Sequence, residues 1–257
     1  MREILIESTL DRTLQPALWS RPETAEPAPL VVGLHTWSYD RFNQLENYLP
    51  LCREYGFALL LPEFRGPNLA ENPRKAEACG SAAARQDVID AIRHVCNQGG
   101  VDRKNIFLLG CSGGGQMALL AAATAPELFR AVAVWCPVSD LALWHRHLSA
   151  TRQHYVRHLE SCLGGTPESA PEQYRERSPA AHPERLRSLP VFIHHGRHDE
   201  VVPFRHSLEL AAKLEAAGNA QVYWEIFDGG HEQMPRRSFA WFAKLAGRRE
   251  NALGITG

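Results

Sequence analysis

The stretch NIFLLGCSGGG, residues 105–115, decides the fold. It opens with a short apolar run, and the helical pattern QMALLAAA follows it at residues 116–123. Between the two, Gly110 and Gly114 flank Ser112 in a G-x-S-x-G motif at a strand-to-helix junction. The glycines allow a turn sharp enough to expose the serine, so the motif predicts that Ser112 is a nucleophile.

Further apolar runs alternate with helical patterns along the chain. They lie at residues 30–35, 57–61, 131–135, 191–194 and 221–227. Continuous apolar strands separated by helices indicate an α/β fold, a mostly parallel central sheet with helices on both faces. A length of 257 residues fits one such domain over residues 1–257. Two earlier segments, 4–7 and 15–19, predict antiparallel edge strands, and Pro16 suits an edge.

Two linking helices and one inserted segment can be placed between these strands. One helix opens after Ser81, a good N-cap residue, and another follows Pro203 and ends at Gly218. Residues 138–190 are too long for a simple crossover, and loops of this length are usually functional. We interpret residues 138–190 as an inserted cap or lid over the carboxyl edge of the sheet; a lengthened crossover helix is the alternative.

The acid and the base that a serine nucleophile needs are found after two later strands. Asp199 follows the run at residues 191–194, and His231 follows the run at residues 221–227. The chain order Ser, Asp, His suits this architecture, and the carboxyl ends of parallel strands meet at one edge. We therefore expect a Ser112–Asp199–His231 triad.

Each partner has an alternative. Glu200 or Asp228 could supply the acid instead of Asp199, and His231 is one of twelve histidines and could be a solvated loop residue. Asp199 is preferred because it sits at the expected strand end, and two glycines before His231 indicate a turn that aims its side chain inward.

The loop after residues 30–35 is expected to complete an oxyanion hole. One amide donor should be Gly113, the residue after the nucleophile, and the other should be Trp37, with Thr36 as the second choice. Thr36, Cys111 and Arg65 are the candidate substrate-binding residues, and an arginine can hold an acidic or hydroxyl-rich group. The alternative for Arg65 is that it anchors its own loop.

Composition excludes several classes of partner. A net charge of -1, 44% hydrophobic residues and 22% charged residues are ordinary for a soluble globular protein. Without a basic cluster interleaved with aromatics we expect no nucleic-acid partner, and without a long apolar stretch no membrane association. The charged amino-terminal segment lacks a signal-peptide core, which predicts a cytoplasmic protein. The pattern leaves the oligomeric state open.

Cysteine and histidine spacing predicts no metal site, and acyl transfer through the expected triad needs no cofactor. The six cysteines show no C-x-x-C pair and are expected to be free and buried, with a Cys79–Cys162 bridge as the alternative. His145, His147, His154 and His158 include an i,i+4 pair, but no acid or cysteine stands at matching spacing. A polar helix face is the simpler interpretation.

Taken together, these residues resemble the α/β-hydrolase superfamily from the His35 loop to His231. Within it the chain is most similar to the catalytic domain of prolyl-oligopeptidase-type serine hydrolases and to the related acetylxylan and feruloyl esterases. The segments that carry this likeness are VDRKNI at residues 101–106 leading into GCSGGG, YRERSP at residues 174–179, and HGRHDEVVP at residues 195–203. The resemblance implies that Ser112, Asp199 and His231 act as nucleophile, acid and base.

The resemblance implies hydrolysis of carboxylic esters, carbohydrate-linked ones among them, through an acyl-enzyme. A peptidase for short peptides is the alternative. Only about 30 residues precede the His35 strand, which leaves no room for the β-propeller of the large peptidases, and no Glu-Glu pair there could hold a peptide amino terminus. Both departures favour a stand-alone esterase with a small-molecule ester substrate. A non-catalytic binding protein on this scaffold usually has a broken triad, and here all three members are present.

Overall fold

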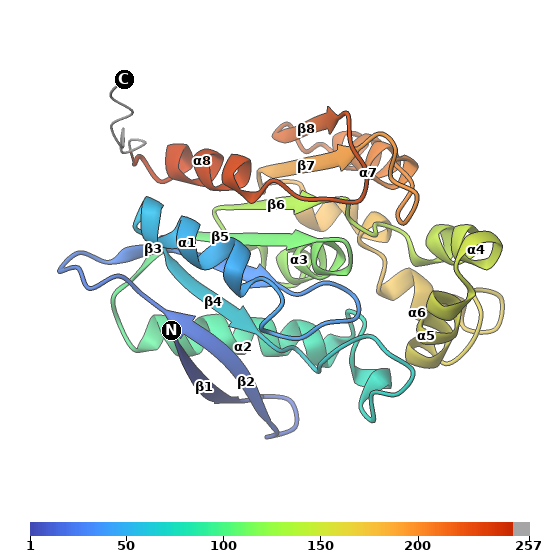
Figure 1. Cartoon of the computed structure of the whole chain (residues 1–257), viewed down its shortest axis with the longest axis horizontal. Helices are drawn as coiled ribbons and strands as arrows, with labels where there is room; N and C mark the ends of the chain where they lie inside the picture. The colour runs from blue at the N-terminus through green and yellow to red at the C-terminus, as the bar shows by residue number, and fades with distance from the viewer. Residues whose placement is uncertain (249–257) are drawn as a thin grey trace.

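The computed structural model describes residues 1–248 and has a sheet of eight strands at its centre (Figure 1). The strands are β1 (Arg2–Glu7), β2 (Leu14–Ser20), β3 (Ala28–Leu34), β4 (Ala58–Pro62), β5 (Val101–Cys111), β6 (Ala131–Trp135), β7 (Val191–Gly196) and β8 (Val222–Phe227). Their order in the sheet is β1-β2-β4-β3-β5-β6-β7-β8. The pairs from β4 to β8 are all parallel, so the predicted mostly parallel sheet is confirmed.

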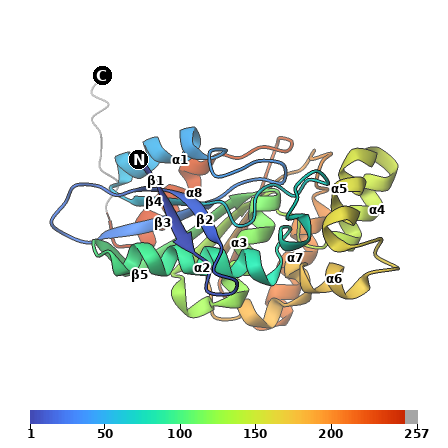
Figure 2. The same ribbon diagram turned by 90° about the horizontal axis from the view of Figure 1, so that it is seen from below.

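Helices cover both faces of this sheet, as Figure 2 shows from below. The helices are α1 (Leu45–Tyr55), α2 (Ala82–Asn97), α3 (Gly113–Thr124), α4 (Leu141–Thr151), α5 (Gln153–Leu163), α6 (Pro171–Glu176), α7 (Arg205–Ala216) and α8 (Pro235–Leu245). Buried side chains of α1 and α8 pack on one face of the sheet, and those of α2, α3 and α7 pack on the other. Two apolar cores therefore sandwich the strands.

The first two strands correct one expectation. β1 and β2 form an antiparallel hairpin as predicted, but β2 also pairs antiparallel with β4 and is not an edge strand. Pro16 is tolerated there because the ladder with β4 begins only at Ala17. A proline lacks an N–H donor, so it suits a position where that donor has no ladder partner.

Local capping signals predict two helices, α2 and α7, and the structure contains both. The Ser81 hydroxyl accepts a hydrogen bond of 3.1 Å from the Ala84 amide at the start of α2, as an N-cap residue should. The helices α1 and α8 are absent from the sequence-based prediction. Pro50 lies inside α1, where proline normally argues against a helix, so packing against the sheet outweighs the local preference.

Residues 138–190 form α4, α5 and α6 with the 3₁₀ turns Pro179–Ala181 and Pro183–Leu186 rather than one long crossover helix. In Figure 1, α4, α5 and α6 gather beyond the carboxyl ends of the central strands. Trp144 of α4 and Val156 of α5 belong to a third apolar cluster, which also contains Trp37 of the loop after β3. This cluster fastens the segment to the edge of the sheet where ligands bind in open α/β folds.

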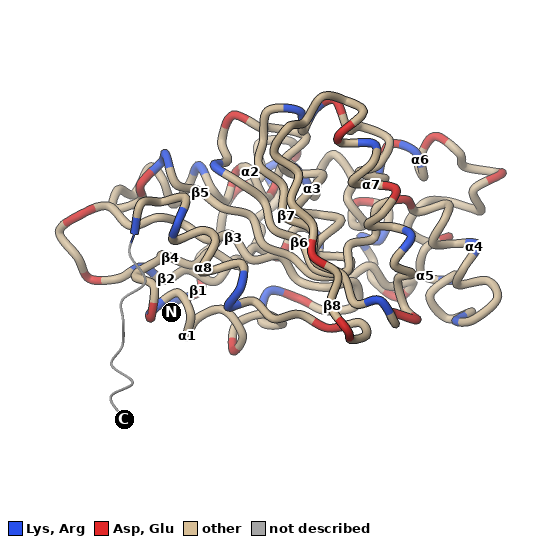
Figure 3. Tube along the Cα trace, turned by 90° about the horizontal axis from the view of Figure 1, so that it is seen from above, with Lys and Arg blue, Asp and Glu red and all other residues tan. Residues whose placement is uncertain are grey.

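Basic and acidic positions are interspersed along the described part of the Cα trace (Figure 3). Within residues 1–248, no helix combines the length and the apolar character that crossing a bilayer requires.

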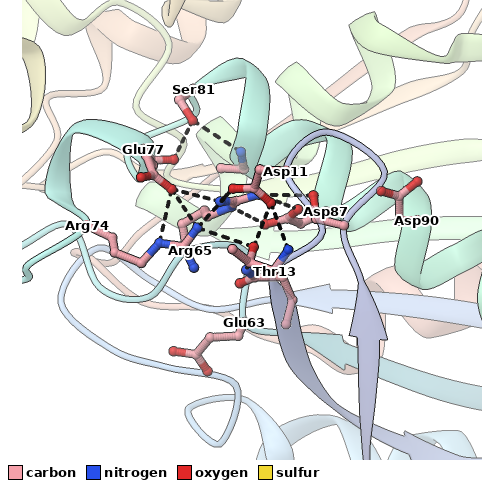
Figure 4. A network of polar contacts seen from close by, with 12 residues as sticks. Asp11, Thr13, Glu63, Arg65, Arg74, Glu77, Ser81, Asp87 and Asp90 are labelled. Carbon is pink, nitrogen blue, oxygen red and sulfur yellow. Dashed lines mark hydrogen bonds and ion pairs between the residues drawn. The ribbon is translucent and has the colours of Figure 1, made fainter.

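A buried arginine anchors the loop after β4 (Figure 4). The Arg65 side chain is fully buried, and its guanidinium donates to both carboxylate oxygens of Asp87 on α2, at 2.5 and 3.0 Å. It also donates to Asp11 at 2.5 Å, to Glu77 at 2.7 Å and to the Ser8 hydroxyl at 3.0 Å. The network thus joins the β1–β2 hairpin, the β4 loop and α2 through one cation.

Replacing Arg65 should destabilise the fold strongly. Arg65→Met leaves the buried Asp87 carboxylate without its counter-ion, and breaking a buried pair in this way costs about 3–5 kcal/mol. Arg12→Met is a matched control, because Arg12 pairs with Glu7 on the surface of the same hairpin and exposed pairs contribute little. Urea unfolding of both variants measures the difference, and equal losses would refute the anchoring role.

Two buried histidines are held neutral. His206 is fully buried, and its Nδ1 accepts from the Ser139 amide at 3.3 Å. Burial lowers the pKa of His206 to about 3. His194 stacks on Trp135 with ring centroids 3.9 Å apart, and burial lowers the pKa of His194 to about 4. Both groups therefore bind a proton more readily in the unfolded chain.

The free energy of unfolding should fall as the pH drops from about 6.5 toward 4. In that window the unfolded chain takes up a proton at each of these imidazoles and the folded chain does not, which gives about 1.4 kcal/mol per pH unit for each. His206→Asn should flatten the dependence, because the amide oxygen still accepts from Ser139 but does not titrate. Urea unfolding between pH 4.5 and 7 tests this. His198→Asn changes an exposed histidine and should keep the wild-type slope; the same slope in all three proteins would contradict the assignment.

Candidate active site

The sharp turn between β5 and α3 presents Ser112. Its backbone has φ 55° and ψ -122°, a left-handed conformation that is unfavourable for serine and is held only by its surroundings. The Ser112 amide donates to the Trp135 carbonyl at 2.8 Å. A Cβ on Gly110 would collide with the Gly114 backbone, so the turn closes only with glycine at that position.

Asp199 and His231 meet beside this turn. The His231 Nδ1 donates to the Asp199 Oδ2 over 2.7 Å. The other carboxylate oxygen accepts from the backbone amides of Val201 at 2.8 Å and Val202 at 2.9 Å, which fixes the carboxylate plane. Because Nδ1 carries the hydrogen of the neutral ring, Nε2 is the nitrogen left free to act as a base. His231 and Ser112 line the same cavity.

His195 is a second histidine on the same carboxylate, and the sequence analysis assigned it no role. Its Nε2 donates to the Val202 carbonyl at 2.8 Å and lies 3.2 Å from the Asp199 Oδ2. The Ser207 hydroxyl completes the arrangement by donating to the His195 Nδ1 at 2.6 Å. The only sequence signal for this contact is that His195, at the end of a strand, lies four residues before Asp199.

Three hydrogen bonds, from His231 and the amides of Val201 and Val202, therefore converge on the Asp199 carboxylate, and His195 Nε2 lies close to it. Burial alone would raise the pKa of this carboxyl, but the neighbouring imidazole groups of His195 and His231 outweigh burial and hold the pKa well below its usual range. Asp199 is consequently ionised throughout the neutral range and can balance a positive charge that develops on His231. The alternative acids, Glu200 and Asp228, are both exposed, and Asp228 pairs with the exposed His198 at 3.0 Å.

The two expected oxyanion donors lie side by side. A Cβ built on Gly113 would stand 3.0 Å from the Trp37 nitrogen. Gly113 is the first residue of α3, so its amide has no partner within the helix, and the Trp37 amide donates to no acceptor in the described part of the chain. The Thr36 amide, the second choice, instead donates to Asn43 Oδ1 at 3.0 Å. This geometry favours Trp37 over Thr36 as the donor.

A cavity of about 300 Å³ brings most of the expected residues together. Its wall consists of Thr36, Trp37, Ser38, Tyr39, Asn43, Gln44, Asn47, Cys111, Ser112, Trp144, Tyr155, Val201, His231, Glu232 and Gln233. Thr36 and Cys111, the other two candidate substrate-binding residues, both line this cavity. Burial raises the pKa of the Cys111 thiol to about 12, so the thiol is protonated at neutral pH. The amide side chains on this wall, and the aromatic rings that α4 and α5 contribute to it, were not predicted, because no local sequence motif marks them.

Arg65, expected as a substrate-binding residue, does not line this cavity. Its guanidinium is committed to Asp11, Glu77 and Asp87, as described above. The reason is that these three carboxylates, two of them far away in the sequence, surround the base of its loop. The structure thus favours the loop-anchoring alternative over a substrate contact.

The cysteines form no disulfide in the described chain, and two of the four histidines on the predicted polar helix face have hydrogen-bond partners. All six thiols are free and buried, and Cys79 and Cys162 share an apolar cluster without a bridge. His145 pairs with Glu160 at 2.8 Å, and His158 accepts from the Ala70 amide at 2.9 Å.

One trio in the described chain has metal-ligand spacing. Cys136, His195 and Asp199 place their ligand atoms within 4.8 Å of one another. In this trio, His195 Nε2 already donates to the Val202 carbonyl, and Asp199 Oδ2 already accepts from His231.

Comparison with known proteins agrees with this geometry. Residues 45–253 match the model of the prolyl oligopeptidase family. The chain is 29% identical over 183 residues to the uncharacterized peptidase YtmA of Bacillus subtilis. The aligned region covers 71% of this chain and 68% of YtmA. The chain is 26% identical over 175 residues to the probable acetylxylan esterase A of Neosartorya fischeri, which covers 66% of this chain and 46% of that protein.

The fold agrees with a solved structure as well. The uncomplexed acylaminoacyl peptidase of Pyrococcus horikoshii superimposes with a TM-score of 0.75 at 21% identity, over 100% of this chain and 42% of that one. The chain thus spans less than half of this peptidase and of the esterase. The match over residues 45–253, together with the sheet and its serine turn, shows that the chain belongs to the prolyl oligopeptidase family of serine hydrolases, with an α/β-hydrolase fold.

Proposed function

We propose that this protein hydrolyses carboxylic esters of small molecules, with Ser112 as nucleophile, His231 as general base and Asp199 as the acid that orients it. The observation that carries the proposal is the meeting of five groups at one cavity. Ser112 and His231 lie on its wall, Asp199 holds His231 from behind, and the amides of Trp37 and Gly113 stand next to each other. Nucleophile, base, orienting acid and oxyanion donors are the parts that acyl transfer needs.

The reaction follows from these roles. His231 Nε2 takes the proton of the Ser112 hydroxyl as its oxygen attacks the ester carbonyl carbon, and the carbonyl oxygen becomes an oxyanion held by the Trp37 and Gly113 amides. The intermediate collapses when the C–O bond to the alcohol breaks and His231 returns its proton to the leaving oxygen. Water, activated by the same base, then attacks the acyl-enzyme and releases the acid and Ser112.

The cavity favours neutral substrates. In the described structure no Lys or Arg stands on its wall, and Glu232 is the acidic residue there. An ester with a carboxylate or phosphate group would meet this charge without a compensating cation. A volume of about 300 Å³ is at the small end for ligand pockets, which favours short acyl groups.

A hydroxyl-rich alcohol, such as a sugar, fits the same wall. Asn43 Nδ2 offers a donor and Asn47 Oδ1 an acceptor, because the hydrogen bonds of these two amides within the described structure use only their other atoms. The rings of Tyr39 and Tyr155 offer apolar faces. The similarity to an acetylxylan esterase supports this choice of substrate class.

Removing either triad member should abolish ester turnover. Ser112→Ala and Asp199→Asn should each lower kcat by about three orders of magnitude or more, because one removes the nucleophile and the other leaves His231 in the wrong tautomer. Glu200→Gln and Asp228→Asn are matched controls for the acid and should keep wild-type kcat. Steady-state hydrolysis of p-nitrophenyl acetate measures all four variants. Activity retained by Ser112→Ala, or lost equally in Glu200→Gln, would refute the assignment.

Hydrolysis of short peptides is the second candidate. Family membership and the peptidase YtmA favour it, because the same triad can expel an amine when His231 protonates the leaving nitrogen. Glu232 adds a specific observation, since a carboxylate on the cavity wall could pair with the amino terminus of a peptide.

A paired assay separates the two candidates. We expect turnover of p-nitrophenyl acetate and of acetylated sugars, little turnover of alanyl- and prolyl-arylamides, and no change of ester kcat/KM in Glu232→Gln. Efficient turnover of the arylamides, with a KM that rises in Glu232→Gln because the ion pair to the free amino group is lost, would move the protein to the peptidases.

A further inference from the structure

A chain of side-chain amides runs along the cavity wall between two loops of the candidate site. The Tyr48 hydroxyl donates to Gln233 Oε1 at 2.9 Å, and Gln233 Nε2 donates to Gln44 Oε1 at 2.8 Å. Gln44 Nε2 then donates to Asn43 Oδ1 at 2.9 Å, and the same oxygen accepts from the Thr36 amide at 3.0 Å. We call Asn43, Gln44 and Gln233 the amide bridge.

Two of the three amides in the bridge have the same direction. Gln233 and Gln44 each accept through the oxygen and donate through the nitrogen, so their dipoles align head to tail and strengthen one another. Asn43 ends the chain, because its oxygen accepts from both Gln44 Nε2 and the Thr36 amide. Gln44 is 2% exposed and Tyr48 is fully buried, so water competes little for these hydrogen bonds. Asn47 Nδ2 adds a third hydrogen bond to the Gln44 side chain by donating to its Oε1 at 3.1 Å, which makes Gln44 the centre of the network.

The two ends of the amide bridge lie on different catalytic loops. Asn43 holds the amide of Thr36, the residue before Trp37, and Gln233 lies two residues after His231. The sheet does not connect these loops directly, because β5, β6 and β7 separate β3 from β8. The amide bridge is therefore a short direct link between the loop of the oxyanion donor and the loop of the base.

We propose that the amide bridge is a positioning element, with Gln44 at its centre, that sets the distance between the Trp37 amide and the His231 ring. This role rests on the proposed function of those two groups. Neither Gln44 nor Asn43 acts on the reacting atoms; they hold the oxyanion loop and the histidine loop in the geometry that the transition state needs.

Gln44→Met tests the role of the central residue. Methionine keeps the length of the side chain and removes both of its hydrogen-bonding groups, so we expect kcat for p-nitrophenyl acetate to fall about tenfold or more while KM changes less than about twofold. Gln15→Met is the matched control. Gln15 is a buried glutamine of the hairpin that donates to the Thr13 hydroxyl, and this variant should keep wild-type kcat.

Gln44→Glu gives a readout that a loss of packing would not. A protonated carboxyl can accept from Gln233 and donate to Asn43, but a carboxylate cannot donate and faces the Asn43 oxygen unfavourably. The ratio of kcat in Gln44→Glu to wild-type kcat should therefore fall as the pH rises. A new negative charge that merely acted on His231 would raise the pKa of the base, and the ratio would then rise with pH.

Hydrogen exchange provides a measurement that does not depend on turnover. Gln44→Met should speed exchange in both residues 35–43 and residues 229–236, whereas Gln15→Met should not. Wild-type protein without any hydrolytic activity would refute the proposed function alone, since the exchange experiment would still test the link. Wild-type kcat in Gln44→Met, a flat or rising ratio in Gln44→Glu, or faster exchange in only one loop would each overturn the positioning role.

Discussion

Close contact between the β3 loop and the start of α3 is the constraint on which the candidate site depends. A Cβ on Gly114 would collide with the carbonyl oxygens of Leu34 and His35, so the two backbones touch with no side chain between them. The contact is possible because β3 and β5 are parallel neighbours, with Leu34 opposite Gly110, and both loops leave the sheet at one edge. It places the Trp37 and Gly113 amides together beside Ser112, and any side chain at residue 114 would push them apart.

Around this contact, buried polar groups connect loops that the sheet does not connect directly. The Asp199 carboxylate gathers two histidines and two backbone amides, which ties the loop after β7 to the loop after β8. On the other side of the cavity, the amide bridge links the histidine loop to the oxyanion loop. Each hydrogen bond contributes modestly, but a buried polar group without its partner is costly, so these networks permit few alternative loop arrangements.

Sequence-based expectations are accurate where the interactions involve neighbouring residues and fail where they involve residues distant in the sequence. The apolar runs, the Ser81 cap and the G-x-S-x-G turn depend on residues a few positions apart, and the structure has each of them in the predicted place. The predicted edge position of β2 is wrong, because it depends on the pairing of β2 with β4. The predicted contact of Arg65 with substrate has no support, because the side chain is held by Asp11 and Asp87. The helix α1 was absent from the prediction because Pro50 breaks its local pattern.

The sequence by itself determined the α/β architecture, the family resemblance and the three residues proposed as the triad. Strand runs, glycine turns and chain order are encoded in neighbouring residues, and parallel strands bring their carboxyl ends to one edge without further information. Tertiary structure alone decided that the Thr36 amide is bonded to Asn43 and that His195 lies against Asp199. It also decided that Arg65 pairs with carboxylates, and that an amide of α1 and aromatic rings of α4 and α5 line the cavity. The physical reason is that hydrogen bonding and burial depend on which groups the folded chain brings together, and partners remote in sequence leave no periodic trace.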